Sequence, residues 1–321
     1  MFPRQPSRRK FLGSSVSAGA FLLADTALAK FSFGDRNGVR KQPSLCLFSK
    51  PLEKLSYAEL ADFGAELGIE GIDLTVRTPG HVSPERVAED LPKAIRSLEA
   101  AGLRVPMITT AIVDARDSST EAIIKTASGL RIPLLKLGYF YYRGFTEVSQ
   151  QLSEIRGRVQ AIAVLCERYQ VQAGFHNHSG AYVGAALWDE SKILEDLPAL
   201  WVGSYFDPAH ATLEGGGAGW KIGLNLLLAR IKMLAIKDFR WERLGTATRS
   251  EAVFGPLGQG EVNWKEVFDI LKNSDFAGPI SLHIEYAVLK ESTQVEKERL
   301  LRTARQDLAF LKAGLKTAGI V

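Results

Sequence analysis

The strongest constraint on this chain is a repeated alternation of short β-rich runs with longer amphipathic stretches, which starts near Ser44 and continues almost to the C-terminus. This rhythm is typical of consecutive βα units that build a parallel sheet. The eight runs that predict strands are 44–49, 71–77, 103–112, 132–139, 171–178, 201–207, 231–239 and 280–286. The clearest helical patterns are 56–67, 146–169, 263–271 and 293–315.

Eight βα units in a chain of 321 residues fit a (β/α)8 barrel, which typically needs about 250 residues plus insertions. A doubly wound sheet is the competing architecture, but no Gly-rich phosphate loop follows the first predicted strand. Nothing in the pattern marks a second domain. The sequence therefore predicts an α/β protein with one (β/α)8 TIM barrel over 43–321, and an enlarged loop over 240–262.

The N-terminus has the three parts of an export signal. The paired basic residues Arg8-Arg9 precede a weakly apolar run over 13–28, which is too short to span a bilayer, and Ala27-Leu28-Ala29 provides a small-x-small cleavage pattern. This arrangement resembles a twin-arginine signal; a basic frayed terminus and a membrane anchor are the alternatives. We expect a signal peptide over 1–29, a linker over 30–42, recognition by the twin-arginine export machinery, and a periplasmic or exported mature protein.

Charge and cysteine content exclude several classes of protein. The net charge is +4, and removal of the expected signal lowers it to about +1, so the concentrated basic face of a nucleic-acid-binding protein is not expected. With two cysteines, the chain has neither a disulfide scaffold nor a four-cysteine zinc module. Cys46 lies in a predicted strand and Cys166 in a predicted helix, so both are interpreted as buried thiols.

All five histidines of the chain follow or end predicted strands. His81 follows the second strand, His176 and His178 end the fifth, His210 follows the sixth, and His283 lies in the eighth. The C-terminal ends of the strands of a barrel meet at one mouth, where the chemistry of such proteins takes place. We therefore predict that the histidines share one site.

Strand alternation adds charged side chains to the same mouth. Residues two apart point to the same side of a sheet, and this rule turns Arg77, Lys237 and Glu285 inward. Asp207 ends the sixth strand. Converging imidazoles and carboxylates suit a divalent cation, although each inward polar residue can also be a buried structural hydrogen-bonding group. The glycines at 215–217, followed by Trp220, favour a flexible lip with an aromatic platform.

These pieces together resemble the xylose isomerase-like TIM barrels, also called sugar phosphate isomerases/epimerases, over 43–315. The matching segments are 71–74, 176–180, 206–210, 236–238, 255–260 and 278–286. The resemblance implies a sugar isomerase or epimerase that holds Mn, Co, Zn or Mg with a Glu of strand five, an Asp of strand six, a His of strand seven and a Glu of strand eight. It also implies proton transfer through an enediolate.

Only some of the metal ligands that the resemblance implies have a match in this sequence. Asp207 and Glu285 match two of the ligands, but His176 stands at the strand-five position and Ala235 at the strand-seven position. The implied metal ligands are therefore His176, Asp207 and Glu285, with His178 or His283 replacing the missing one. His210 matches the substrate-side histidine of the family.

The sequence thus predicts an exported isomerase or epimerase of a small-molecule carbohydrate, with a divalent metal and no nucleic-acid partner. The expected catalytic residues are Glu285, Lys237 and His210, with Glu285 or a histidine of the mouth as the base. The expected substrate-binding residues are Arg77, His81, Lys136, His178, Trp220 and His283. A lyase or dehydratase acting on an oxidised keto sugar with a single base, and a sugar-binding barrel without catalysis, are the alternatives. A homo-oligomer is compatible with the sequence.

Overall fold

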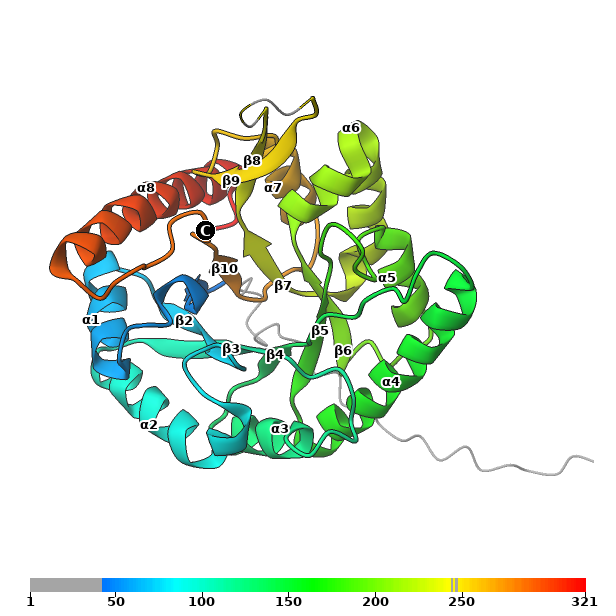
Figure 1. Cartoon of the computed structure of the whole chain (residues 1–321), viewed down its shortest axis with the longest axis horizontal. Helices are drawn as coiled ribbons and strands as arrows, with labels where there is room; N and C mark the ends of the chain where they lie inside the picture. Colours follow the sequence, from blue (N-terminus) through cyan, green and yellow to red (C-terminus); the bar gives the residue numbers. More distant parts are fainter. Residues whose placement is uncertain (1–41, 244, 246–247) are drawn as a thin grey trace, which may run out of the picture.

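The computed structural model describes residues 42–321 except 244, 246 and 247. In this part of the chain, eight parallel strands close into a barrel (Figure 1). Around the barrel the strands are β1 (Leu45–Phe48), β10 (Ile280–Leu282), β7 (Ile231–Ile236), β6 (Val202–Phe206), β5 (Gln172–His176), β4 (Leu134–Lys136), β3 (Arg104–Thr110) and β2 (Gly71–Val76). The predicted single (β/α)8 TIM barrel is confirmed.

The α-helices form an outer ring around the barrel (Figure 1). They are α1 (Tyr57–Leu67), α2 (Val87–Ala100), α3 (Thr120–Gly129), α4 (Val148–Tyr169), α5 (Leu187–Leu194), α6 (Pro208–Leu227), α7 (Trp264–Lys272) and α8 (Gln294–Ala318). Short 3-10 turns lie at Lys50–Leu52, Pro84–Arg86 and Leu228–Arg230. Local sequence fixes several helix starts: Ser56 and Glu59 form a reciprocal capping box at α1, and Asn263 caps α7.

All eight strands end earlier than their sequence predicts, and the differences at β7 and β10 are among the largest. The predicted strand 231–239 stops at Ile236, and the chain turns at Lys237 into an antiparallel hairpin of β8 (Asp238–Glu242) and β9 (Glu251–Gly255). The predicted strand 280–286 stops at Leu282: Ile280–Leu282 pair with β1 and β7, and the N–H of His283 makes a last backbone hydrogen bond to the carbonyl oxygen of Ile236. The segment 240–262, expected to be a loop, therefore contains most of a hairpin.

The interior of the barrel is filled by side chains. Its central layer contains Cys46, Met107, Leu134, Tyr205, Met233 and Ala235. Gly174 is required here, since a Cβ atom at this position would lie 2.2 Å from Cε of Met233. Burial raises the pKa of the Cys46 thiol, in agreement with a structural role. The packed interior leaves the strand ends as the places where a substrate can reach polar groups.

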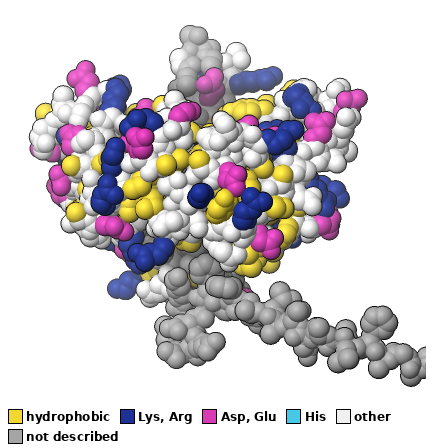
Figure 2. Space-filling model, turned by 90° about the horizontal axis from the view of Figure 1, so that it is seen from below, with side chains coloured by type: hydrophobic (Ala, Val, Ile, Leu, Met, Phe, Trp, Pro, Cys, Tyr) yellow, Lys and Arg dark blue, Asp and Glu magenta, His cyan; other side chains and the backbone are white. Residues whose placement is uncertain are grey.

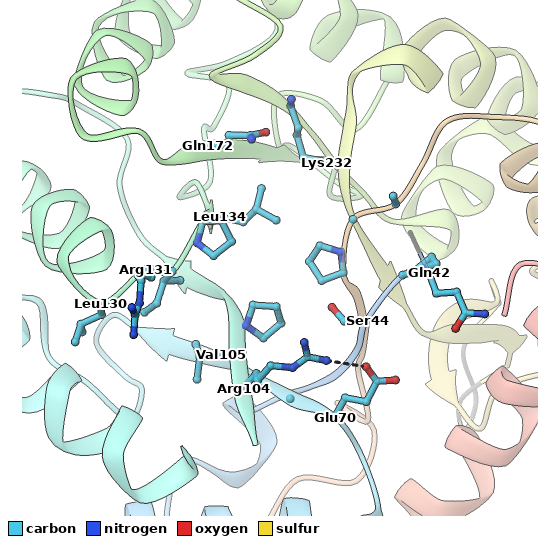
Figure 3. Close-up of a pocket in the computed structure, with 18 of the residues that line it drawn as sticks. Gln42, Ser44, Glu70, Arg104, Val105, Leu130, Arg131, Leu134, Gln172 and Lys232 are labelled. Carbon is cyan, nitrogen blue, oxygen red and sulfur yellow. Dashed lines mark hydrogen bonds and ion pairs between the residues drawn. The ribbon is translucent and has the colours of Figure 1, made fainter. Parts of the chain in front are cut away.

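A cavity of about 1060 Å³ opens at the N-terminal ends of the strands. Its lining includes Glu70, Arg104, Gln172 and Lys232, and Arg104 donates to Glu70 across it (Figure 3). These residues lie at the starts of β2, β3, β5 and β7, so the cavity lies at the opposite end of the barrel from the histidines. In barrels of this type the catalytic groups come from the C-terminal ends, and we do not assign this cavity to the reaction.

The surface of the described residues carries charges of both signs, which are interspersed on the face shown in Figure 2. Within the same residues, no helix has both the length and the apolar character needed to cross a membrane. The predicted signal peptide and all but Gln42 of the predicted linker lie outside the described part of the chain.

A buried carboxyl group on α5 leads to a prediction about stability. Glu190 is fully buried, and this burial raises its pKa to about 8 although the nearby Ser204 side chain opposes the shift. Between the unfolded pKa of about 4.3 and the folded value, the folded state keeps a proton that the unfolded state has released, so stability decreases as pH rises through this window. Glu190→Gln stays neutral, and its free energy of unfolding at pH 8 is expected to exceed that of wild type by roughly 2–4 kcal/mol.

Denaturant unfolding of Glu190→Gln at pH 5 and pH 8 measures this effect. The difference from wild type should be small at pH 5 and large at pH 8. The exposed Glu195, at the end of the same helix, provides the control Glu195→Gln. An equal gain at both pH values would show that ionisation of Glu190 is not the cause.

Candidate active site

The centre of the candidate site is one ammonium group between two carboxylates. Nζ of Lys237 lies 3.2 Å from Oδ2 of Asp207 and 3.2 Å from Oε2 of Glu285. Burial alone would lower the pKa of Lys237, but the two carboxylates outweigh it and raise this pKa above its usual value. Burial likewise opposes ionisation of Asp207 and Glu285, yet Lys237 holds both of their pKa values well below the usual range. All three groups are therefore charged at neutral pH.

Asp207 is rigidly positioned at the junction of β6 and α6. Its Oδ1 accepts hydrogen bonds from the backbone N–H groups of Ala209 at 2.9 Å and His210 at 3.1 Å, which caps α6. Asn177, at the end of β5, donates to its carbonyl oxygen and accepts from its backbone N–H. Oδ1 of Asp207 thus holds the start of α6 through hydrogen bonds, while Oδ2 of Asp207 faces Lys237.

Three histidines gather beside this ion pair. The ring centroids of His178 and His210 are 3.9 Å apart, and the ring of His176 lies 6.0 Å from His210 and 6.2 Å from His178. Nε2 of His176 and Nε2 of His210 lie 3.5 Å and 3.8 Å from Oδ2 of Asp207. Burial lowers the pKa of His176 to about 3 and also lowers the pKa values of His178 and His210. At neutral pH the three imidazoles are uncharged.

Hydrogen bonding determines which nitrogen of His178 holds its proton. Nδ1 of His178 lies 2.9 Å from the carbonyl oxygen of Ser179. A carbonyl oxygen only accepts, so Nδ1 carries the hydrogen and Nε2 keeps its lone pair. His178 is half-buried, whereas His176 and His210 are buried. Of the three, His178 is the imidazole best suited to take a proton from a bound molecule.

Below the ion pair, a buried network extends from Glu285 toward the barrel interior. Nδ1 of His283 lies 3.4 Å from Oε2 of Glu285, and its Nε2 lies 2.8 Å from the hydroxyl of Tyr205. Tyr205 donates in turn to Asp73, which also accepts from Ser281. Since β10 ends at Leu282, Glu285 is positioned by His283 and by its ion pairs with Lys237 and Lys50, and not by strand alternation.

Sequence reasoning misses two residues of the site. Nζ of Lys50, a residue just after β1, lies 2.9 Å from Oε1 of Glu285. Its position directly after a predicted strand is the sequence feature that could have placed it in the site. Tyr205 in β6 gives no such signal, because an aromatic residue in a strand is usually a core residue.

The other residues predicted from the sequence are distributed around the barrel. His81 bonds Thr75, at 3.2 Å from Nδ1, and burial lowers its pKa to about 4. Nε of Arg77 and Nζ of Lys136 are buried, and neither has a hydrogen-bond partner among the described residues. Nζ of Lys136 lies 3.4 Å from the centroid of the Tyr139 ring, and burial lowers the pKa of this lysine well below its usual value.

The structure does not leave Trp220 exposed at the mouth of the barrel. Its side chain is buried in the hydrophobic core and lines a separate cavity of about 310 Å³, together with Phe239 and Trp241. The predicted lip at 215–217 lies inside α6, where Gly216 adopts a φ of 55° and kinks the helix. The segment 215–220 therefore does not form the predicted aromatic platform over the mouth.

The donor atoms do not fit the divalent metal that the sequence predicts. Between residues 42 and 321, the described side chains include no group of three or more His, Cys, Asp or Glu that could hold a metal ion. Ala235 contributes no donor atom and lies in the packed interior. The ammonium of Lys237 lies where Asp207 and Glu285 would have to share an ion.

The fold and these residues define a (β/α)8 barrel with a charged, histidine-rich site at the C-terminal ends of its strands. A model of the family described as xylose isomerase-like TIM barrel matches residues 61–313. The chain belongs to the xylose isomerase-like TIM barrel family.

A curated protein matches part of the chain. The chain is 28% identical over 143 residues to inosose dehydratase 1 of Bacillus cereus, an alignment that covers 42% of this chain and 46% of the relative. The chain thus matches less than half the length of this curated relative.

Solved structures share the fold at low sequence identity. The IolI protein with a bound zinc atom superimposes with a TM-score of 0.66 at 15% identity, over 86% of this chain and 99% of that one. L-ribulose 3-epimerase superimposes with a TM-score of 0.62 at 15% identity, over 86% and 95%. These similarities show that the fold is shared.

Proposed function

We propose that this chain is a dehydratase of keto sugars: it removes the proton next to a ketone and eliminates the neighbouring hydroxyl group as water. The observation that carries the proposal is the ammonium of Lys237 beside uncharged imidazoles. A fixed positive charge stabilises an enolate oxygen, and a neutral imidazole with a free lone pair accepts the proton. The name of the dehydratase relative supports the same reaction class.

Different residues of the mouth carry out different parts of the proposed reaction. Lys237, and Arg77 from the end of β2, bind the ketone oxygen and stabilise its developing charge. Nε2 of His178 takes the proton from the adjacent carbon. The electrons of the broken C–H bond form a C=C bond as the next C–O bond breaks, and the imidazolium of His178 returns its proton to the departing oxygen, which leaves as water.

Elimination is favoured over epimerisation by the residue at the end of β5. An ordinary two-sided epimerisation uses two bases on opposite faces of the reacting carbon, and the resemblance implies a glutamate here. His176 replaces it, and its side chain is buried against Asp207 at 3.5 Å. One base is sufficient for elimination. An epimerase is the second candidate, because an L-ribulose 3-epimerase has the same fold.

A panel of keto sugars and keto-cyclitols in deuterated water distinguishes these reactions. A dehydratase gives a product lighter by one water, which is an enol or its diketone tautomer because the carbon that loses the proton also carries a hydroxyl group. An epimerase or isomerase gives an isomer of the substrate that carries solvent deuterium. Tight binding without either product would indicate the sugar-binding alternative and would overturn the proposal.

His178→Gln tests the assignment of the base. It is expected to lower kcat by about 10²- to 10⁴-fold, because general-base catalysis contributes that range. His81→Gln is the matched comparison, since Nδ1 of His81 lies 3.2 Å from the hydroxyl of Thr75 and the described ring contacts of the three-histidine group do not include His81. A similar loss of kcat in both variants would argue against a specific proton-accepting role for His178.

We also propose that the chain is exported through the twin-arginine pathway, on the basis of the N-terminal pattern at 1–29. The full chain produced in a bacterium should be found in the periplasm after cleavage, and Arg8→Lys with Arg9→Lys should keep it in the cytoplasm. Unchanged export of this double variant would contradict the proposal.

A further inference from the structure

The charges around Asp207 and Glu285 are already balanced within the chain. Lys237 bridges the two carboxylates at 3.2 Å from each, and Lys50 approaches the other oxygen of Glu285 at 2.9 Å. Two ammonium groups therefore face two carboxylates. A divalent cation is attracted to a site by uncompensated negative charge, and this cluster has none to offer.

The position of Lys237 is fixed by the fold. It is the residue at which the chain leaves β7 for the β8–β9 hairpin, and its side chain is buried. Its Nζ also lies 5.1 Å from the centroid of the Phe254 ring, which belongs to that hairpin. The hairpin and the two carboxylates together hold the ammonium over the mouth of the barrel.

We propose that Lys237 is the resident cation of this site, so that the protein binds no divalent metal at Asp207 and Glu285 and uses the lysine ammonium in its place. The ammonium keeps both carboxylates ionised and presents a positive charge to the oxygen of a bound ketone. The statement about the ketone rests on the proposed dehydratase function; the statement about the metal does not.

The donor set explains why a metal would not displace the lysine. A metal ligand at the β7 position would have to come from Ala235, which is fully buried in the layer that contains Met233 and Tyr205. Oδ1 of Asp207 is occupied by two backbone N–H groups. A metal ion at Oδ2 would lie close to an ammonium whose charge opposes its own.

Metal binding by the full purified chain tests this inference. The protein is incubated with Zn²⁺, Mn²⁺, Co²⁺ or Mg²⁺ in separate samples and desalted. Metal content is then determined by elemental analysis, and thermal unfolding is followed with and without each ion. Wild type is expected to retain far less than one ion per chain and to show no stabilisation. One ion per chain, lost in Asp207→Asn, would overturn the inference.

The variant Lys237→Met gives an independent readout. Without the Lys237 ammonium, only Lys50 faces the two carboxylates, so one negative charge is uncompensated. Divalent ions should therefore raise the midpoint of thermal unfolding of this variant. Lys237→Arg keeps the charge and should remain insensitive to the same ions. If Lys237→Met folds and gains no response to the ions, the ammonium is not what excludes them; if it does not fold, the wild-type measurement decides.

These metal measurements need no substrate. Failure of the substrate panel would therefore remove the proposed dehydratase function and leave the metal result intact. Stoichiometric metal in wild type would remove the inference about Lys237 and leave the reaction class open to the assay.

Discussion

Replacement of Lys237 by Met is expected to reduce kcat/KM for the keto-sugar substrate by about 10²- to 10³-fold, the usual effect of removing one group that stabilises an oxyanion. The effect should fall mainly on kcat, because the charge on the oxygen develops only as the proton leaves. Lys237→Arg keeps the charge but changes its geometry, and it should recover part of the activity. Steady-state kinetics of the three proteins provide the measurement.

Lys232→Met is the matched control for this experiment. Lys232 lies on the same strand β7 but lines the cavity at the N-terminal ends of the barrel strands. Its replacement removes a half-buried lysine without changing the mouth, and kcat should stay within a few-fold of wild type. Equal losses in both variants would mean that the barrel as a whole, and not the ammonium at the mouth, is responsible.

Asp207→Ala is expected to lower the free energy of unfolding by roughly 3–5 kcal/mol, because it leaves a buried ammonium without one of its partners. Two further contacts disappear with the carboxylate, namely the hydrogen bonds from the backbone N–H groups of Ala209 and His210. Loss of a helix cap costs about 1 kcal/mol by itself. Denaturant unfolding at pH 7 measures the sum.

Two variants separate these contributions. Asp207→Asn keeps an oxygen for the helix cap and should be less destabilised than Asp207→Ala. In the double variant with Asp207→Ala and Lys237→Met, neither charge remains, so it should recover part of the stability lost in Asp207→Ala alone. If the effects of the two single substitutions simply add, Asp207 and Lys237 are not energetically coupled as their 3.2 Å separation indicates.

Much of the fold is readable from local patterns. Capping at Ser56 and Asn263 and the alternation of β-rich and amphipathic runs are properties of short segments, so eight strands and their order followed from the sequence. The same patterns failed at strand ends. β7 and β10 stop at Ile236 and Leu282 because the hydrogen-bonding partners end there, and a partner strand is distant in the sequence.

The residues of the candidate site were likewise predictable only in part. The strand-end positions of His176, His178, Asp207 and His210 predicted that these residues lie together, and the contacts between them agree with that arrangement. Trp220 shows the limit of this reasoning, since the kink at Gly216 and the packing of α6 turn the indole into the core.

The sequence by itself determined the barrel, its histidine-rich mouth and its departure from the usual metal ligands at His176 and Ala235, because these follow from residue type and from position relative to strand ends. Only the tertiary structure decided that the ammonium of Lys237 lies between Asp207 and Glu285. These three residues come from the end of β6, the end of β7 and the segment after β10, and only closure of the barrel brings their charges within 3.2 Å.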